Sequence, residues 1–137
     1  MNKHTYLRAY MAGIMTPTIF FLVVATAYYM WRYVYNVPVP VERVLIFPMA
    51  VVPNLWGLWN VLFVASHERT HLPIGIHGAI LPFILAPLGI LLTNALDFPA
   101  LPYATRFFPI AAPIALIAYY LVWKYLVSFL NRVLAIA

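Results

Sequence analysis

Long runs of apolar residues dominate the chain, and short polar stretches separate them. Four runs reach the length that membrane crossing needs, roughly 20 residues for a hydrocarbon core of about 30 Å. They are residues 9–31, 44–66, 72–96 and 107–131. The first two contain no charged residue, the third has only His77 near its beginning, and the fourth has only Lys124 near its end. The pattern therefore predicts four transmembrane helices.

The connections between these runs are short, at residues 32–43, 67–71 and 97–106. Helices joined by short connections tend to pack as antiparallel neighbours. We therefore expect an all-α integral membrane protein, an up-down-up-down bundle of four transmembrane helices that forms a single domain over residues 1–137. A function would then reside in the bundle, at its two rims or in contacts with other chains.

Basic residues are distributed unequally between the two predicted sides. The side with both termini and the second connection carries Lys3, Arg8, Arg69, Lys124 and Arg132, and the opposite side carries Arg32, Arg43 and Arg106. Cytoplasmic ends of membrane proteins carry the excess of Lys and Arg. We therefore expect both termini in the cytoplasm of a multi-pass protein, and we expect the membrane to be a bacterial inner (plasma) membrane.

Composition excludes several classes of function. Only 8% of the 137 residues are charged and 66% are hydrophobic, whereas a soluble domain normally has about 25% charged residues. The net charge of +5 comes from basic residues that are scattered singly, so nucleic acid is not an expected partner. The chain has no cysteine, which excludes disulfides and thiolate chemistry. The expected partners are the lipid bilayer and further membrane subunits.

Prolines and asparagines repeat between the second and third predicted helices. Residues Pro48, Pro53 and Asn60 are followed 34 positions later by Pro82, Pro87 and Asn94. Such an echo between neighbouring helices, with seven prolines inside the spans, is typical of the inverted repeats and broken helices of transporters. Simple kinks are the alternative interpretation. No acid or base lies deep in a predicted span, which argues against a proton-coupled pump.

One polar segment, HERTHLPIGIHG at residues 67–78, contains three of the four histidines. On a helix the H-E-x-x-H pattern places His67 and His71 on one face, where both imidazoles can bind the same zinc ion. Glu68 could then act as general base for a metal-bound water, and His77 would supply a third ligand. The sequence leaves the cofactor unknown; if these histidines bind a metal, zinc is the candidate, with iron or haem as alternatives. A polar connection without a metal is the other interpretation.

This segment resembles the zincin metalloprotease signature, and its H-x3-H-x5-H spacing is similar to that of the metzincin branch. The resemblance implies zinc ligation by His67, His71 and His77, with Glu68 as the catalytic base. It covers only about a dozen residues. The sequence also departs from the family pattern, because Gly75 stands one place later than the metzincin turn requires and no methionine turn follows.

A polar stripe is predicted on the second helix. Helical periodicity places Asn60, His67 and His71 on one face, with Trp56 deeper on the same side. We expect this stripe to face the bundle interior, where amides and imidazoles find hydrogen-bond partners. Asn94 is the counterpart of Asn60 in the echo and a second candidate for the lining of a cavity.

Three functions are compatible with these observations. The first, which we favour, is a non-enzymatic helical subunit of a homo-oligomer or of a larger membrane complex, including a small channel or transporter. The second is a membrane-embedded zinc hydrolase that uses Glu68 and the three histidines at the membrane rim. The third is haem or structural metal binding by the same histidines.

Overall fold

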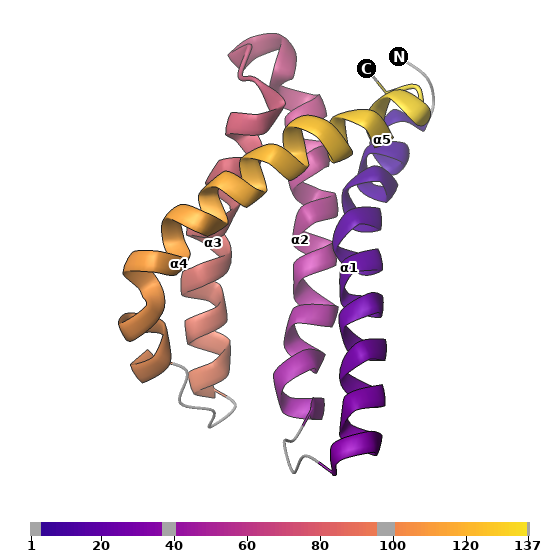
Figure 1. Ribbon diagram of the computed structural model, residues 1–137. Coiled ribbons are helices and arrows are strands. Elements are labelled where there is room, and N and C mark those ends of the chain that lie inside the picture. The colour runs from indigo at the N-terminus through magenta and orange to yellow at the C-terminus, as the bar shows by residue number, and fades with distance from the viewer. Residues whose placement is uncertain (1–3, 37–40, 96–100, 137) are drawn as a thin grey trace.

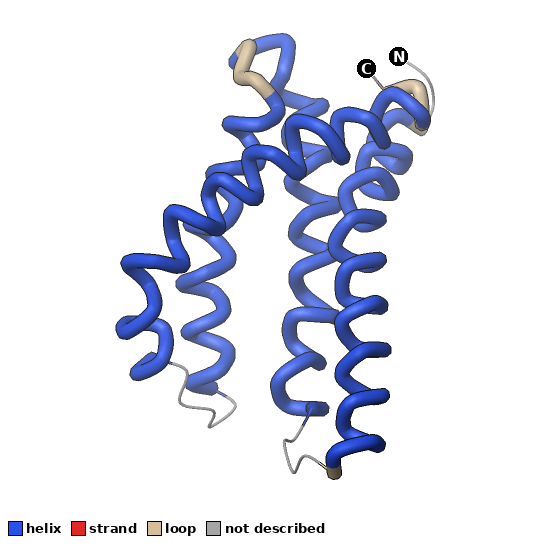
Figure 2. The backbone as a smooth tube through the Cα atoms, viewed as in Figure 1, coloured by secondary structure: helices blue, strands red, loops and turns tan. Residues whose placement is uncertain are grey.

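The computed structural model describes residues 4–36, 41–95 and 101–136, with the backbone alone at 41–47, 93 and 101–105. This part of the chain is almost entirely helical (Figures 1 and 2). The elements are α1 (Thr5–Tyr35), α2 (Val41–Thr70), α3 (Ile74–Ala95), α4 (Leu101–Val122), the π-helical turn η1 (Trp123–Val127) and α5 (Ser128–Val133). The last three follow one another directly, and they form a single continuous helical arm.

Four helical segments are long and apolar enough to cross a membrane, which confirms the predicted number. They are Thr5–Tyr35, Pro48–Thr70, Ile74–Leu92 and Arg106–Val133. Each overlaps one of the four apolar runs of the sequence. The chain therefore has the helices of a multi-pass membrane protein.

The prolines predicted to lie within the spans all fall inside continuous helices. They are Pro17, Pro48, Pro53, Pro82, Pro87, Pro109 and Pro113. A proline removes one backbone donor from a helix, and transmembrane helices tolerate this loss when nearby groups supply partners. In the described residues none of the four spans is interrupted in the manner of the broken helices of transporters. Residues 71–73 are the connection between α2 and α3.

The connection between α2 and α3 has a clear cause in Pro73. A residue that precedes proline is kept out of the α conformation, so α2 ends at Thr70. His71 takes the left-handed conformation, with φ 48°, and its N–H donates to the carbonyl of His67 at 3.0 Å. The carbonyl of Pro73 then accepts from the N–H of His77 at 3.1 Å as α3 begins. The helix therefore extends three residues beyond His67 and excludes His71.

Two helix pairs form the molecule, α1 with α2 and α3 with α4. The arm formed by α4, η1 and α5 leaves α3 and crosses to reach α1 (Figure 1). Both ends of the chain lie at one end of the molecule, together with residues 71–73 (Figure 1). We call this the terminal end, and we call the end with Asn36, Ala95 and Leu101 the distal end.

Small residues allow α1 and α2 to approach very closely. A Cβ atom built on Gly13 would lie 2.5 Å from the carbonyl oxygen of Trp56 and 2.7 Å from the Cα of Gly57. Ala9 and Ala12 are fully buried in the same contact. The spacing of Ala9 and Gly13 is the small-x3-small pattern of transmembrane helix pairs, where backbone contact replaces the hydrophobic effect as the source of stability.

The core of the protein lies toward the terminal end and is aromatic. Trp56, Leu81, Trp123 and Val127 form one buried cluster, contributed by α2, α3 and η1. A Cβ atom on Gly78 would lie 2.0 Å from Cγ of Trp123. The absence of a side chain at position 78 is therefore what allows the indole to lie against the backbone of α3.

Candidate functional site

The structure places the three histidines of the predicted metal site in different environments. His67 is exposed in the last turn of α2, and His71 is exposed in the connection beyond the helix. His77 is buried near the beginning of α3, and Glu68 is exposed. Among the residues that the structure describes, no three His, Asp or Glu side chains are arranged to hold a metal ion. The geometry gives no support to zinc, iron or haem ligation, which stays a prediction from the sequence pattern.

His77 is instead held between helices α2 and α3 by a reciprocal contact with Trp59. The His77 ring stacks on the Trp59 ring, with centroids 4.7 Å apart. The indole N–H of Trp59 donates to the carbonyl of His77 at 2.8 Å, and Nε2 of His77 lies 3.0 Å from the carbonyl oxygen of Trp59. A carbonyl only accepts hydrogen bonds, so Nε2 carries the proton and donates. Both side chains thus fasten α3 to α2.

Phe63 connects the buried histidine to the exposed one. Its ring centroid lies 4.8 Å from that of His67 and 5.3 Å from that of His77. The Trp123 ring meets His77 from the other helical arm, at 6.0 Å and edge to face. The histidines on α2 and α3 therefore belong to an aromatic cluster, and packing on aromatic rings accounts for their positions.

Asn60 and Asn131 form a buried amide pair at the centre of the terminal end. Their exposed fractions are 0% and 2%. The amide nitrogen of Asn60 donates to Oδ1 of Asn131 at 2.8 Å, and the amide nitrogen of Asn131 donates to Oδ1 of Asn60 at 3.1 Å. Asn60 also donates to the carbonyl of Ala9 at 2.7 Å. One side chain thus links α1, α2 and α5, and burial of an amide is stable only with such partners.

The π-helical turn η1 separates α4 from α5 and sets the direction of the residues that follow. Single π-turns within α-helices are rare and frequently occur at functional sites. Here η1 begins with Trp123, which is fully buried, although its indole N–H has no hydrogen-bond partner among the described residues. Directly after it, Ser128, Asn131 and Arg132 are spaced i, i+3 and i+4 and share one face of α5.

A half-open pocket of about 260 Å³ lies beside the amide pair at the terminal end. Phe63 and Ile74 supply its apolar wall. Its polar wall consists of His67, Ser128, Asn131 and Arg132. The pocket therefore joins the end of α2, the beginning of α3 and the polar face of α5, and we call it the rim pocket.

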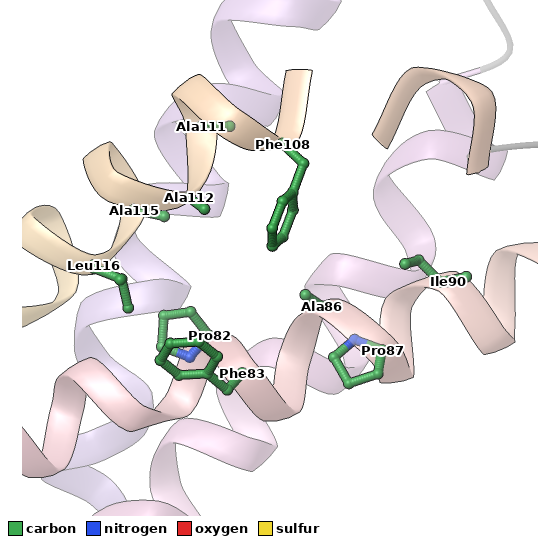
Figure 3. Close-up of a pocket in the computed structure, with 10 residues that line it drawn as sticks. All are labelled: Pro82, Phe83, Ala86, Pro87, Ile90, Phe108, Ala111, Ala112, Ala115 and Leu116. Carbon is green, nitrogen blue, oxygen red and sulfur yellow. The ribbon is translucent and has the colours of Figure 1, made fainter. Parts of the chain in front are cut away.

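A larger pocket of about 390 Å³ lies between α3 and α4 and is lined by apolar residues (Figure 3). The residues that line it are Pro82, Phe83, Ala86, Pro87, Ile90, Phe108, Ala111, Ala112, Ala115 and Leu116. Figure 3 shows the Phe108 side chain extending from α4 into the space between the helices, while Ala112 and Ala115 leave that space open. We call it the α3–α4 pocket. It offers contact surface and no catalytic group.

The residues of the predicted polar stripe and its counterpart Asn94 differ in burial. Asn60 is fully buried and Trp56 is 5% exposed, in ring contact with Tyr119 and Trp123. Asn94 is exposed near the end of α3. The two asparagines of the sequence echo therefore have different environments, and only Asn60 is buried.

Sequence reasoning missed the contribution of the last helical segment. Asn131 and Arg132 stand at the end of an apolar run, where polar residues are expected at a membrane boundary. Gly78 and Trp123 carry no local sign that one fits against the other. An asparagine near the end of a predicted span was the available signal, because intramembrane amides pair across helices.

Comparison of the chain with known protein families, with curated proteins and with solved structures found no match. The class of protein thus follows from the helices themselves: an all-helical chain with four segments able to cross a membrane.

Proposed function

We propose that this chain is a structural subunit of a homo-oligomeric membrane assembly and that copies meet through the α3–α4 face. The observation that carries the proposal is the α3–α4 pocket, an apolar recess with a wall of small residues on the least buried of the four spans. The α3–α4 pocket is also lined by the rings of Phe83 and Phe108, which are 64% and 57% exposed. A second copy of the chain is the occupant that we propose.

Small residues at helical spacing favour a protein helix over a lipid tail as this occupant. Ala111 and Ala115 are four positions apart on α4 and line the same pocket. Lipid tails are as apolar as leucine, so the hydrophobic effect gives helices in a bilayer no reason to associate. Close backbone approach over small residues supplies that reason through van der Waals contact.

We further propose an up-down-up-down arrangement with both termini in the cytoplasm of a bacterial inner membrane. Support comes from the two chain ends, which lie together in Figure 1, and from the basic residues Arg8, Arg69, Lys124 and Arg132 of the terminal end. The positive-inside rule assigns such an end to the cytoplasm.

A channel or transporter built from this subunit would place its path between copies. Within one protomer the buried amides of Asn60 and Asn131 bond to each other. His77 and Trp59 likewise satisfy each other's polar groups. These groups therefore line no open polar route through the protomer, and the transport part of the proposal depends on oligomer formation.

Oligomeric state in lipid nanodiscs or mild detergent tests the proposal, by crosslinking and native mass spectrometry. The wild-type chain is expected to form dimers or larger species. Ala111→Leu partly fills the pocket and should lower the oligomer fraction several-fold, because overpacked interfaces separate. Ile117→Trp is the control, since it adds bulk at a position that is 62% exposed, outside the pocket lining and about 120° around α4 from Ala111.

A strictly monomeric wild-type chain at all concentrations would overturn the proposal. Retention of a lipid by that monomer, lost in Ala111→Leu and kept in Ile117→Trp, would identify the pocket as a lipid site. Equal effects of Ala111→Leu and Ile117→Trp would show that oligomer formation does not depend on the α3–α4 pocket.

A further inference from the structure

The rim pocket is lined by residues with hydrogen-bond donors and a positive charge, and the subunit proposal gives these residues no role. Among the residues that line the pocket are Arg132, Ser128 and His67, whose side chains carry a guanidinium, a hydroxyl and an imidazole. The amide nitrogen of Asn131 carries two hydrogens, and its bond to Asn60 uses one of them. Most of these groups are hydrogen-bond donors, and one is a permanent cation.

We propose that the rim pocket binds a phosphate group, carried either by an anionic phospholipid headgroup or by a free phosphate ion. A guanidinium presents several N–H donors in a planar fork that matches phosphate oxygens. A phosphate accepts from several directions at once, which suits a wall whose donors come from both α2 and α5. This inference does not depend on oligomer formation.

The surrounding charges favour an anion. Three further basic side chains, Arg8, Arg69 and Lys124, stand on the segments of the terminal end. Lys124 lies over the rings of Tyr120 and Tyr125, at 5.5 and 5.4 Å from their centroids, and it does not line the pocket. Glu68 is the only carboxylate side chain that the structure describes, and it is exposed beside His67.

The fold holds one side chain of the polar wall, that of Asn131, and the backbone of α5 that carries the others. Asn131 is fixed by its two bonds to Asn60, and it stands one residue before Arg132 on α5. The end of α5 is closed by bonds from Ala135 to the carbonyl of Arg132 and from Ile136 to that of Asn131, at 3.0 and 2.9 Å. The Asn131 amide and the backbone of α5 are therefore in place before a ligand arrives, which reduces the entropy lost on binding.

The position of the pocket along the spans suits a headgroup. It is lined by residues at the end of α2, the beginning of α3 and the end of the fourth span. Basic pockets between transmembrane helices at the cytoplasmic side commonly bind phosphorylated lipid headgroups. The apolar wall of Phe63 and Ile74 would lie against the glycerol and upper acyl part of such a lipid.

The test uses the full chain with two probes. In the first arm, the chain is reconstituted in phosphatidylcholine nanodiscs with phosphatidylglycerol as the minor lipid, and native mass spectrometry measures retained phosphatidylglycerol. In the second arm, inorganic phosphate is titrated against the chain in nanodiscs of phosphatidylcholine alone, followed by ³¹P NMR. Arg132→Gln should lower binding about 10-fold or more, as expected for loss of a bidentate charged contact.

Arg69→Gln is the matched control. It removes one positive charge from the same end of the molecule, but Arg69 does not line the pocket. Its effect should stay within about twofold, because exposed charges act weakly and are screened by salt. Ser128→Ala should weaken binding by a smaller factor than Arg132→Gln. If Arg132→Gln does not yield a folded, monodisperse protein, Arg132→Lys replaces it, and loss of the planar fork should still weaken binding.

The outcomes of the two arms distinguish a phospholipid headgroup from a free phosphate ion as the ligand. Loss of phosphatidylglycerol retention in Arg132→Gln, without binding of inorganic phosphate to the wild-type chain, identifies a lipid headgroup site. Phosphate binding that depends on Arg132, without selective lipid retention, identifies a site for a free phosphate. Equal effects of Arg132→Gln and Arg69→Gln in both arms, or no binding in either, would overturn the proposal.

Discussion

The terminal and distal ends of this molecule are built from different kinds of contact. At the terminal end the buried residues include amides and aromatic rings, among them Asn60, Asn131 and Trp123. At the distal end, large aliphatic side chains are exposed, with Leu91 at 67% and Ile110 at 69%. The molecule thus buries a pair of amides and exposes many large apolar side chains, whereas a soluble protein usually does the opposite.

The difference follows from the solvent. In a bilayer an exposed leucine costs nothing, whereas an amide facing lipid without a partner costs several kcal/mol. Polar and small residues therefore determine where helices meet, and large apolar residues cover the surface. The contrast predicts that stability depends on a few terminal-end contacts and little on the distal surface.

The largest expected effect is that of Gly78→Ala. The added Cβ would lie 2.0 Å from Trp123 Cγ, and a fully buried indole has no space to move away. Overpacking of this kind destabilises by about 1–3 kcal/mol, measured as a lower free energy of unfolding in mixed micelles. Gly75→Ala is the control, because its Cβ would meet the ring of Tyr120 at 2.8 Å. That ring is only half-buried and can rotate, so a smaller loss is expected.

The amide pair provides the second test. Asn131→Leu leaves Asn60 without its partner and should cost about 1–3 kcal/mol of unfolding free energy. The double variant Asn60→Leu/Asn131→Leu removes both polar groups, so its cost should be smaller than the sum of the two single costs. Additive losses within error would mean that the two amides do not stabilise the fold through each other.

A smaller effect is expected for Trp59→Phe. The variant loses the hydrogen bond from the indole to the carbonyl of His77, and a net hydrogen bond contributes about 1 kcal/mol. Trp31→Phe is the matched control, because Trp31 is 57% exposed near the end of α1. Equal unfolding free energies for the two variants would show that the Trp59 contact does not hold α3 to α2.

The smallest effect is expected at the distal end. Leu91→Ala should change the unfolding free energy by less than about 0.5 kcal/mol, as for most exposed positions. Ile114, which is 62% exposed, should behave in the same way. A loss of 2 kcal/mol or more, roughly that of a core truncation, would show that this surface is buried against another chain under the conditions of the measurement.

The candidate site could be predicted only in part. The sequence drew attention to Asn60, because an amide within an apolar run needs a partner, and the structure places it against Asn131. The H-E-x-x-H interpretation assumed that the helix continues through His71. Pro73 was the local signal against it, since a residue before proline avoids the α conformation, and α2 indeed ends at Thr70.

What the sequence determined by itself was the number of membrane helices and their approximate limits. Hydropathy and run length act on each segment separately, so no tertiary contact is needed to identify a span. The tertiary structure alone decided which residues meet. Asn60 and Asn131 are 71 positions apart, and their pairing depends on the path of the α4–η1–α5 arm toward α1 (Figure 1). Contacts between residues far apart in the sequence determine the path of this arm, and no local sequence pattern predicts it.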